Sequence, residues 1–159
     1  MAAEKEKLTL VVFNGGFDHA QAAFIIATTA ASMGMEVTMF FTFWGCTVIK
    51  KGRRLKGKKF TQKLINLMLP ANSKSLAPSK MSFGGLGRHF FNYVMKGQMS
   101  SLEEQIELAV ESGVKFQVCS PSLGMMGFDA DEWAVPVDIC GVAAMYDTAL
   151  NARTAYFIS

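Results

Sequence analysis

Three cysteines are the residues of this sequence best suited to chemistry. Cys119 ends the apolar run at 114–118, Cys46 follows an aromatic stretch, and Cys140 precedes a glycine. A thiolate can take up sulfur or exchange disulfides when it is deprotonated and rigidly held. Free cysteine is also among the residue types most often buried, so the residues alone leave both packing and reactivity open for Cys119.

The segments that would hold these thiols alternate between strand and helix patterns. Apolar and β-branched runs predict strands at 8–13, 36–42, 114–118 and 154–158, beside a further segment at 137–141. Periodicity predicts helices at 19–33, 60–69, 86–95, 102–112 and 142–151, with a short one near 129–133. The alternation predicts an α/β fold, a three-layer α/β/α sandwich with a mainly parallel sheet of about five strands.

The expected helix ends have recognisable cap residues. Asp18 is a candidate N-cap for the first helix, and Ser100 or Ser101 for the helix at 102–112. Gly34 and Gly113 suit the positions just after two helices, where positive φ is common.

Open parallel sheets bind ligands beyond the carboxyl ends of their strands. The turn at 14–16, Cys46 and Cys119 each lie just past such an end, which predicts a shared rim. Backbone N–H groups and small residues there could hold an anion or substrate. The candidates are Asn14, Gly15, Gly16, His19, Ser120 and Gly124, although a structural role is the simpler interpretation of His19.

The charge of the chain is unevenly distributed. Twelve of the sixteen Lys and Arg residues lie within 37–102, a segment without Asp or Glu. Such a segment indicates either a solvated surface or one that meets an anion, an acidic partner or a sister subunit. Half of the residues are apolar and 18% are charged, which favours surface buried in a homo-oligomer.

Several classes of protein fit the sequence poorly. The uncharged runs at 20–35 and 37–49 are shorter than a membrane span, and MAAEKEK lacks the features of an export signal, so we expect a cytoplasmic protein without membrane association. GRRLKGK resembles a phosphate loop, but Lys59 replaces its Ser or Thr. Three cysteines without CxxC spacing and two histidines predict no metal and no cofactor.

Five stretches together resemble the DsrE/DsrF/TusD superfamily of small sulfur-relay proteins, in its DsrE-like branch with a long central insertion. They are the first strand with its turn and alanine-rich helix, FFTFWGCTVIKK, SKMSFGGLGRHFFNYVM, SSLEEQIELAVESGVKFQVCSPSLGMMGF and ICGVAAMYDTALNARTAYFI. The resemblance implies a parallel α/β sandwich, oligomeric assembly, and a cysteine at the position of Cys119 that carries sulfane sulfur as a persulfide.

We therefore interpret residues 1–159 as one DsrE-like domain with a basic helical insertion at about 47–99. The hypothesis is a sulfur carrier or sulfurtransferase with Cys119 as its catalytic thiol. Cys46 is either a second thiol of the site or a packed residue. The expected partners are sulfur-donor and sulfur-acceptor proteins or small thiols, and not DNA. The alternative is a non-catalytic module that binds an anion or nucleotide through residues 37–102.

Overall fold

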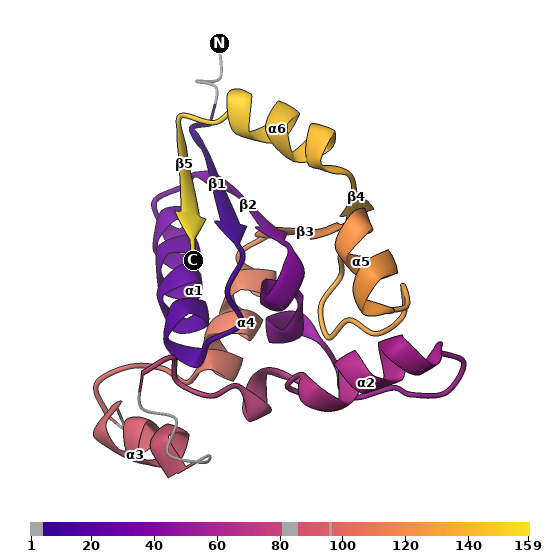
Figure 1. The fold of residues 1–159 in the computed structure, drawn as a ribbon. Helices are drawn as coiled ribbons and strands as arrows, with labels where there is room; N and C mark the ends of the chain where they lie inside the picture. Colours follow the sequence, from indigo (N-terminus) through magenta and orange to yellow (C-terminus); the bar gives the residue numbers. More distant parts are fainter. Residues whose placement is uncertain (1–4, 81–85, 96) are drawn as a thin grey trace.

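A five-stranded, wholly parallel sheet forms the centre of the protein (Figure 1). The computed structural model describes residues 5–80, 86–95 and 97–159. The strands lie in the order β4-β3-β2-β1-β5. Their bounds are Lys7–Val12 (β1), Glu36–Phe41 (β2), Lys115–Cys119 (β3), Asp138–Cys140 (β4) and Thr154–Ile158 (β5). The predicted fold class is confirmed, and the carboxyl ends of all five strands meet at one edge of the sheet.

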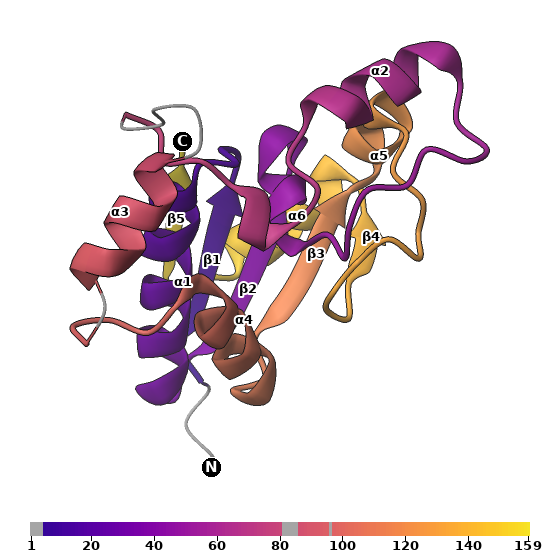
Figure 2. The same cartoon turned by 90° about the horizontal axis from the view of Figure 1, so that it is seen from below.

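Helices lie on both faces of this sheet (Figure 2). The long α1 (Phe17–Ser32) and α4 (Leu102–Glu111) pack side by side on one face, and α6 (Val142–Leu150) crosses the other. The short α5 (Ser120–Met126) follows β3 directly, and α2 (Phe60–Met68) lies against it. Beyond these lie α3 (Leu86–Met95) and two 3-10 helices, η1 (Phe43–Ile49) and η2 (Ser73–Ser75).

The core fills the space between the sheet and the α1–α4 pair. Alternate residues of each central strand point to this side, so that Leu10, Met39 and Val118 are fully buried. Phe24 of α1 packs against the rings of Phe41 and Phe116, with centroids 6.3 and 6.2 Å away. The intervening residues, which include Thr9, Thr38 and Gln117, point to the side of α6 and are largely polar.

Some predicted caps are confirmed and others are wrong. Ser101 accepts a hydrogen bond from the Glu104 amide in a capping box, and Gly34 and Gly113 have φ of 87° and 75°. Asp18, however, is not the N-cap of α1, because Gly16 holds that position. The Asp18 carboxylate instead accepts hydrogen bonds from the amide and hydroxyl of Ser79.

Two segments after Cys119 differ from the prediction. Residues 120–126, expected as a loop, form α5, because Pro121 fits the first turn of a helix and Gly127 ends it with φ of 68°. The short helix expected near 129–133 is absent, since Trp133 instead forms an antiparallel bridge with Lys50. The bridge ties this turn to the beginning of the basic segment.

A buried cluster of charges holds the basic segment against the domain. The Lys50 ammonium lies 3.4 Å from a Glu132 carboxylate oxygen and 3.2 Å from the Asn66 side-chain oxygen. The Lys58 ammonium contacts the other Glu132 oxygen, and Lys50 also lies over the ring of Phe128, 4.1 Å from its centroid. Both lysines and the glutamate are buried, so Glu132 is the buried counter-charge that the two ammonium groups share, while the half-exposed Asp129 carboxylate lies 3.8 Å from Lys58. Burial lowers the pKa of Lys50 despite the neighbouring Glu132.

In the described part of this segment, five basic residues are bound through their side chains to groups of the chain itself. Besides Lys50 and Lys58, Arg53 donates to two backbone carbonyls, and Arg54 donates to both carboxylate oxygens of Asp131 at 2.7 Å. Arg88 donates to backbone carbonyls of η2 and its flank and pairs with Glu103. Much of the positive charge thus serves to attach the insertion.

The buried cluster predicts a specific loss of stability. Glu132→Gln keeps the size of the side chain but leaves Lys50 and Lys58 without their buried counter-charge, which costs about 3–5 kcal/mol of unfolding free energy. Asp131→Asn is the matched control, because its ion pair with Arg54 is exposed and should matter little. Urea denaturation of the two variants measures the difference. Equal midpoints for both variants would contradict the structural role of the cluster.

Candidate functional site

The strand order brings the three cysteines together at the carboxyl edge of the sheet. Cys119 is the last residue of β3, and Cys140 is the last residue of the edge strand β4. The two are register partners across the β3–β4 ladder. Cys46 lies in η1, which follows β2, the other neighbour of β3. Cys119 therefore occupies the middle of the group, and its charge raises the pKa of both other thiols.

Cys119 is held at the junction of a strand and a helix. It is both the end of β3 and the N-cap residue of α5, and only 3% of it is exposed. Val118 points into the core, so the alternation along the strand directs Cys119 to the opposite face. Register partners in a parallel ladder lie on the same face, and Cys140 therefore shares this side with Cys119.

Cys46 has the properties of a packed residue. It is fully buried and belongs to the hydrophobic core. Burial, and secondarily the charge of Cys119, raise its pKa to about 12. The sequence left open a second thiol of the site or a packed residue; the burial favours packing, and a role of Cys46 in the site stays a prediction.

Cys140 is the most accessible of the three thiols. It is partly exposed, whereas Cys46 and Cys119 are buried. Burial, followed by the charges of Cys119 and Asp138, raises its pKa above the ordinary value. The sequence alone singled out no role for Cys140, because its partner became visible only with the strand order.

A hydroxyl of α5 connects the Cys119 strand to the end of β2. The Ser122 oxygen lies 3.0 Å from the Thr42 hydroxyl and accepts a hydrogen bond from the Phe43 amide at 3.1 Å. Phe43 has φ of 47°, a left-handed conformation that is strained for a bulky residue. These bonds stabilise that strained conformation and hold the start of α5 in place beside η1. Sequence reasoning missed Ser122, since nothing local distinguishes it from Ser120.

The turn at 14–16 lies at the same edge of the sheet as Cys119 but two strands away from it. It follows β1, and β2 lies between β1 and β3. The Gly16 amide of this turn donates to the Asn14 side chain at 2.8 Å, and the next amide, that of Phe17, donates to the Ala77 carbonyl at 2.9 Å. A Cβ on Gly15 would lie 2.6 Å from the Trp44 carbonyl, so this glycine permits close packing against η1.

The other candidate binding residues are divided between two places. His19 is partly buried in the first turn of α1, with its Nδ1 3.7 Å from an Asp18 oxygen. Ser120 and Gly124 lie exposed on α5, directly after Cys119. Anion binding by the turn at 14–16, by His19 and by this part of α5 stays a prediction.

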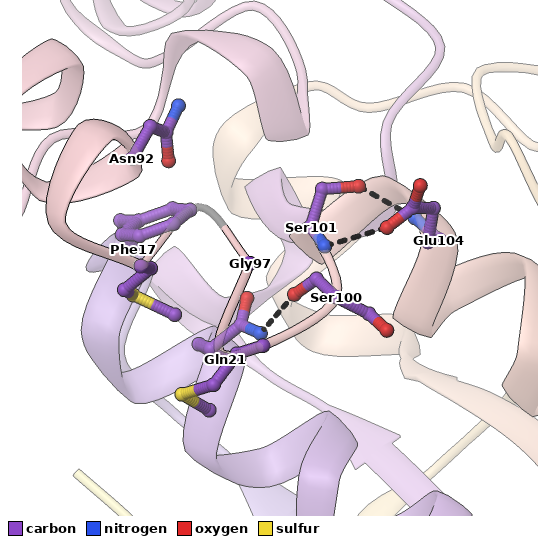
Figure 3. A pocket seen from close by; sticks show the side chains of 9 residues that line it. Phe17, Gln21, Asn92, Gly97, Ser100, Ser101 and Glu104 are labelled. Carbon is purple, nitrogen blue, oxygen red and sulfur yellow. Dashed lines mark hydrogen bonds between the residues drawn. The ribbon is translucent and has the colours of Figure 1, made fainter.

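A hollow of about 340 Å³ lies between α1, α3 and the start of α4 (Figure 3). Its walls include Phe17, Asn92 and Gln21, whose amide nitrogen donates to the Ser100 carbonyl at 2.9 Å. No cysteine lines it, so this hollow is not the thiol site. Within the described residues, no group of three His, Cys, Asp or Glu side chains could hold a metal ion.

The fold and the rim define a small parallel α/β protein with a shielded thiol at a strand end. The chain belongs to the DsrE/DsrF/DrsH-like family, whose sequence pattern matches residues 4–157. This assignment confirms the resemblance drawn from the sequence.

Two relatives and one structure extend the comparison. The chain is 36% identical over 160 residues to the uncharacterised protein YrkE of Bacillus subtilis, covering 99% of this chain and 100% of YrkE. It is 28% identical to the sulfur carrier protein DsrE2 of Allochromatium vinosum, covering 98% and 99%. The crystal structure of YchN from E. coli has a TM-score of 0.53 at 11% identity, covering 96% of this chain and 98% of YchN, and therefore shares the fold.

The close packing of η1 against β1 gives a second prediction. A Cβ on Gly45 would lie 2.1 Å from the Val12 carbonyl oxygen, so Gly45→Ala must displace backbone and should cost about 1–3 kcal/mol of stability or more. Gly124→Ala is the control, because nothing lies within 4 Å and alanine favours the helix. Thermal unfolding should show a lower midpoint for the first variant only. An unchanged midpoint for Gly45→Ala would contradict the packing.

The three thiols should differ in reactivity. At pH 8 a thiol with a pKa of about 12 is ionised in only about one molecule in ten thousand, so Cys46 should resist iodoacetamide in the folded protein. Cys140, which is partly exposed, should be alkylated first. Peptide mass mapping over time measures the order, and the protein in urea is the control in which all three react. Equal rates for Cys46 and Cys140 in the folded protein would refute this assignment.

Proposed function

We propose that this protein is a sulfur carrier that holds sulfane sulfur as a persulfide on Cys119 and passes it to an acceptor thiol. The observation that carries the proposal is the position of Cys119, at the carboxyl end of a central strand and beside two further thiols. Membership of the DsrE/DsrF/DrsH-like family and the likeness to a sulfur carrier support a role in sulfur relay.

Both steps of the transfer are thiol exchanges without net oxidation. The Cys119 thiolate attacks the outer sulfur of a donor persulfide, so that a new S–S bond forms and the donor thiolate leaves. An acceptor thiolate then attacks the outer sulfur on Cys119, and Cys119 leaves as a thiolate. Cys119 is thus the nucleophile of the first step and the leaving group of the second. The donor supplies the sulfane sulfur, and the acceptor supplies the thiolate that removes it.

The burial of Cys119 is consistent with storage of a labile sulfur. With 3% of the residue exposed, small thiols in solution reach a sulfur bound there only slowly. A donor or acceptor must therefore displace side chains at the rim. Phe43, Trp44 and Met125 are exposed apolar residues on η1 and α5, the elements beside Cys119. They offer a surface to partner proteins, which favours protein donors and acceptors over small thiols.

The expectations about assembly and location belong to this proposal. Exposed apolar side chains gather on α6 and β5, where Tyr146, Leu150 and Phe157 are each more than half exposed. We place the contact of the predicted homo-oligomer there. In the described part of the chain, no helix combines the length and the hydrophobicity needed to cross a bilayer. The cytoplasmic location stays a prediction.

The alternative of an anion-binding module receives less support. Arg53 and Arg54 would be the main anion-binding residues of such a surface. Arg53 instead donates to backbone carbonyls, and Arg54 donates to Asp131. The exposed lysines that remain, such as Lys51, Lys56 and Lys63, are spread along a loop and a helix. We therefore retain the sulfur carrier as the function that the geometry supports best.

Intact mass after exposure to sodium tetrasulfide tests the carrier function. Reduced protein, quenched with acid at intervals, should gain ~32 Da, the mass of one sulfur, and lose it on addition of dithiothreitol. Cys119→Ser should show no such gain, whereas Cys46→Ala, a matched control at a buried thiol, should load like the wild type. Equal loading of Cys119→Ser would refute the proposal. So would the absence of any gain in both the wild type and Cys140→Ser.

A further inference from the structure

The ladder between β3 and β4 ends in two facing cysteines. Cys119 and Cys140 are register partners at the last position of both strands. Neighbouring strands lie about 4.8 Å apart, and disulfides form when the two Cα atoms are about 4.4–6.8 Å apart. The two side chains leave the same face of the sheet. This placement meets the Cα-distance requirement for a disulfide.

The surroundings of Cys140 allow the small adjustment that bond formation needs. β4 has three residues and pairs with β3 alone, so its end is held by few hydrogen bonds. Gly141 follows directly, and nothing within 4 Å would touch a Cβ at that position. Cys46, by contrast, is enclosed on all sides in the core. Of the two thiols beside Cys119, Cys140 has the freedom to move toward it.

We propose that Cys140 is the resolving thiol of Cys119, which attacks the Cys119 persulfide, releases its outer sulfur as sulfide and leaves a Cys119–Cys140 disulfide. The proposal rests on the proposed function for its persulfide, whereas the disulfide pair rests on the register alone. When no acceptor is bound, this reaction is a second route by which the stored sulfur leaves Cys119.

The step balances without a further oxidant. The Cys140 sulfur attacks the inner sulfur, which belongs to Cys119, so that the Cys140–Cys119 S–S bond forms and the bond to the outer sulfur breaks. The outer sulfur leaves with the electron pair and takes up the thiol proton as hydrogen sulfide. The sulfane sulfur is reduced by two electrons, and the two cysteines are oxidised by two. A thiol reductant of the surroundings then restores both cysteines.

The protonation of Cys140 keeps this step slower than delivery to a partner. Its pKa is raised by burial, by Cys119 and by Asp138, so most of it is a thiol near neutral pH. An acceptor that arrives with a thiolate therefore takes the sulfur first. Without an acceptor, the attack by Cys140 releases the stored sulfur as sulfide and leaves the protein with a Cys119–Cys140 disulfide.

The first arm of the experiment tests the pair without persulfide. Reduced protein is treated with diamide, digested without reductant and mapped by mass. The expected product is a loss of ~2 Da and a peptide that links Cys119 to Cys140 in both the wild type and Cys46→Ala. Cys140→Ser should form no internal link. A link between Cys119 and Cys46, or no internal link in the wild type, would overturn the pairing.

The second arm follows the stored sulfur. Protein loaded with sodium tetrasulfide is freed of excess donor by rapid gel filtration, and its mass and the sulfide released are followed at pH 7.5. In the wild type, the ~32 Da gain should convert to a ~2 Da loss with one sulfide per chain. In Cys140→Ser the gain should persist at least about tenfold longer, because the attacking thiol is gone.

The outcomes separate the two proposals. Gains of equal lifetime in the wild type and Cys140→Ser would overturn the resolving role and leave the carrier function standing. If neither protein gained the mass of a sulfur but diamide still linked Cys119 to Cys140, the carrier function and the resolving step would both be overturned. The assignment of Cys119 and Cys140 as a disulfide pair would stand. Loading that is lost only in Cys140→Ser would make Cys140 the entry thiol and also overturn the proposed step.

Discussion

The parallel pairing of β3 between β2 and β4 is the constraint on which the site depends. Because every ladder in the sheet is parallel, the chain must leave each strand at the same edge. Cys119 and Cys140 end the adjacent strands β3 and β4 there, and Cys46 lies in η1, the helix that follows β2. More than 70 residues separate Cys46 from Cys119 along the chain, yet the pairing of β2 with β3 brings the segments that carry them to the same edge.

Contacts that restrict the backbone conformation keep this edge of the sheet rigid. Phe43 adopts a left-handed conformation, and Ser122 stabilises it through the Phe43 amide and the Thr42 hydroxyl. Gly45 lies so close to the Val12 carbonyl that no side chain fits. These contacts join the ends of β1 and β2 to η1 and to α5, the helix that follows Cys119. Under the proposed function, a thiol held by these contacts keeps its position when a partner binds or dissociates.

The sequence was sufficient for all five strands, for most of the helices and for the edge at which the strands end, but not for which strands are neighbours. Strand and helix patterns are local, so α3 and β5 were predicted with the bounds that the structure shows. Strand order depends on which nonlocal pairs form, so the facing of Cys140 and Cys119 could not be read from spacing. The basic segment misled for a related reason, because Glu132, the counter-charge of Lys50 and Lys58, lies more than 70 residues beyond them.

The burial of the three thiols assigns them different chemistry although they lie together. Cys46 is fully enclosed, with a pKa raised to about 12, so it is the least able to supply a thiolate. Cys119 is shielded and lies at a strand end, where it is the N-cap residue of α5. Cys140 is partly open to solvent on an edge strand. Under the proposed function, the protected thiol stores sulfur and the accessible thiol beside it releases that sulfur when no acceptor takes it.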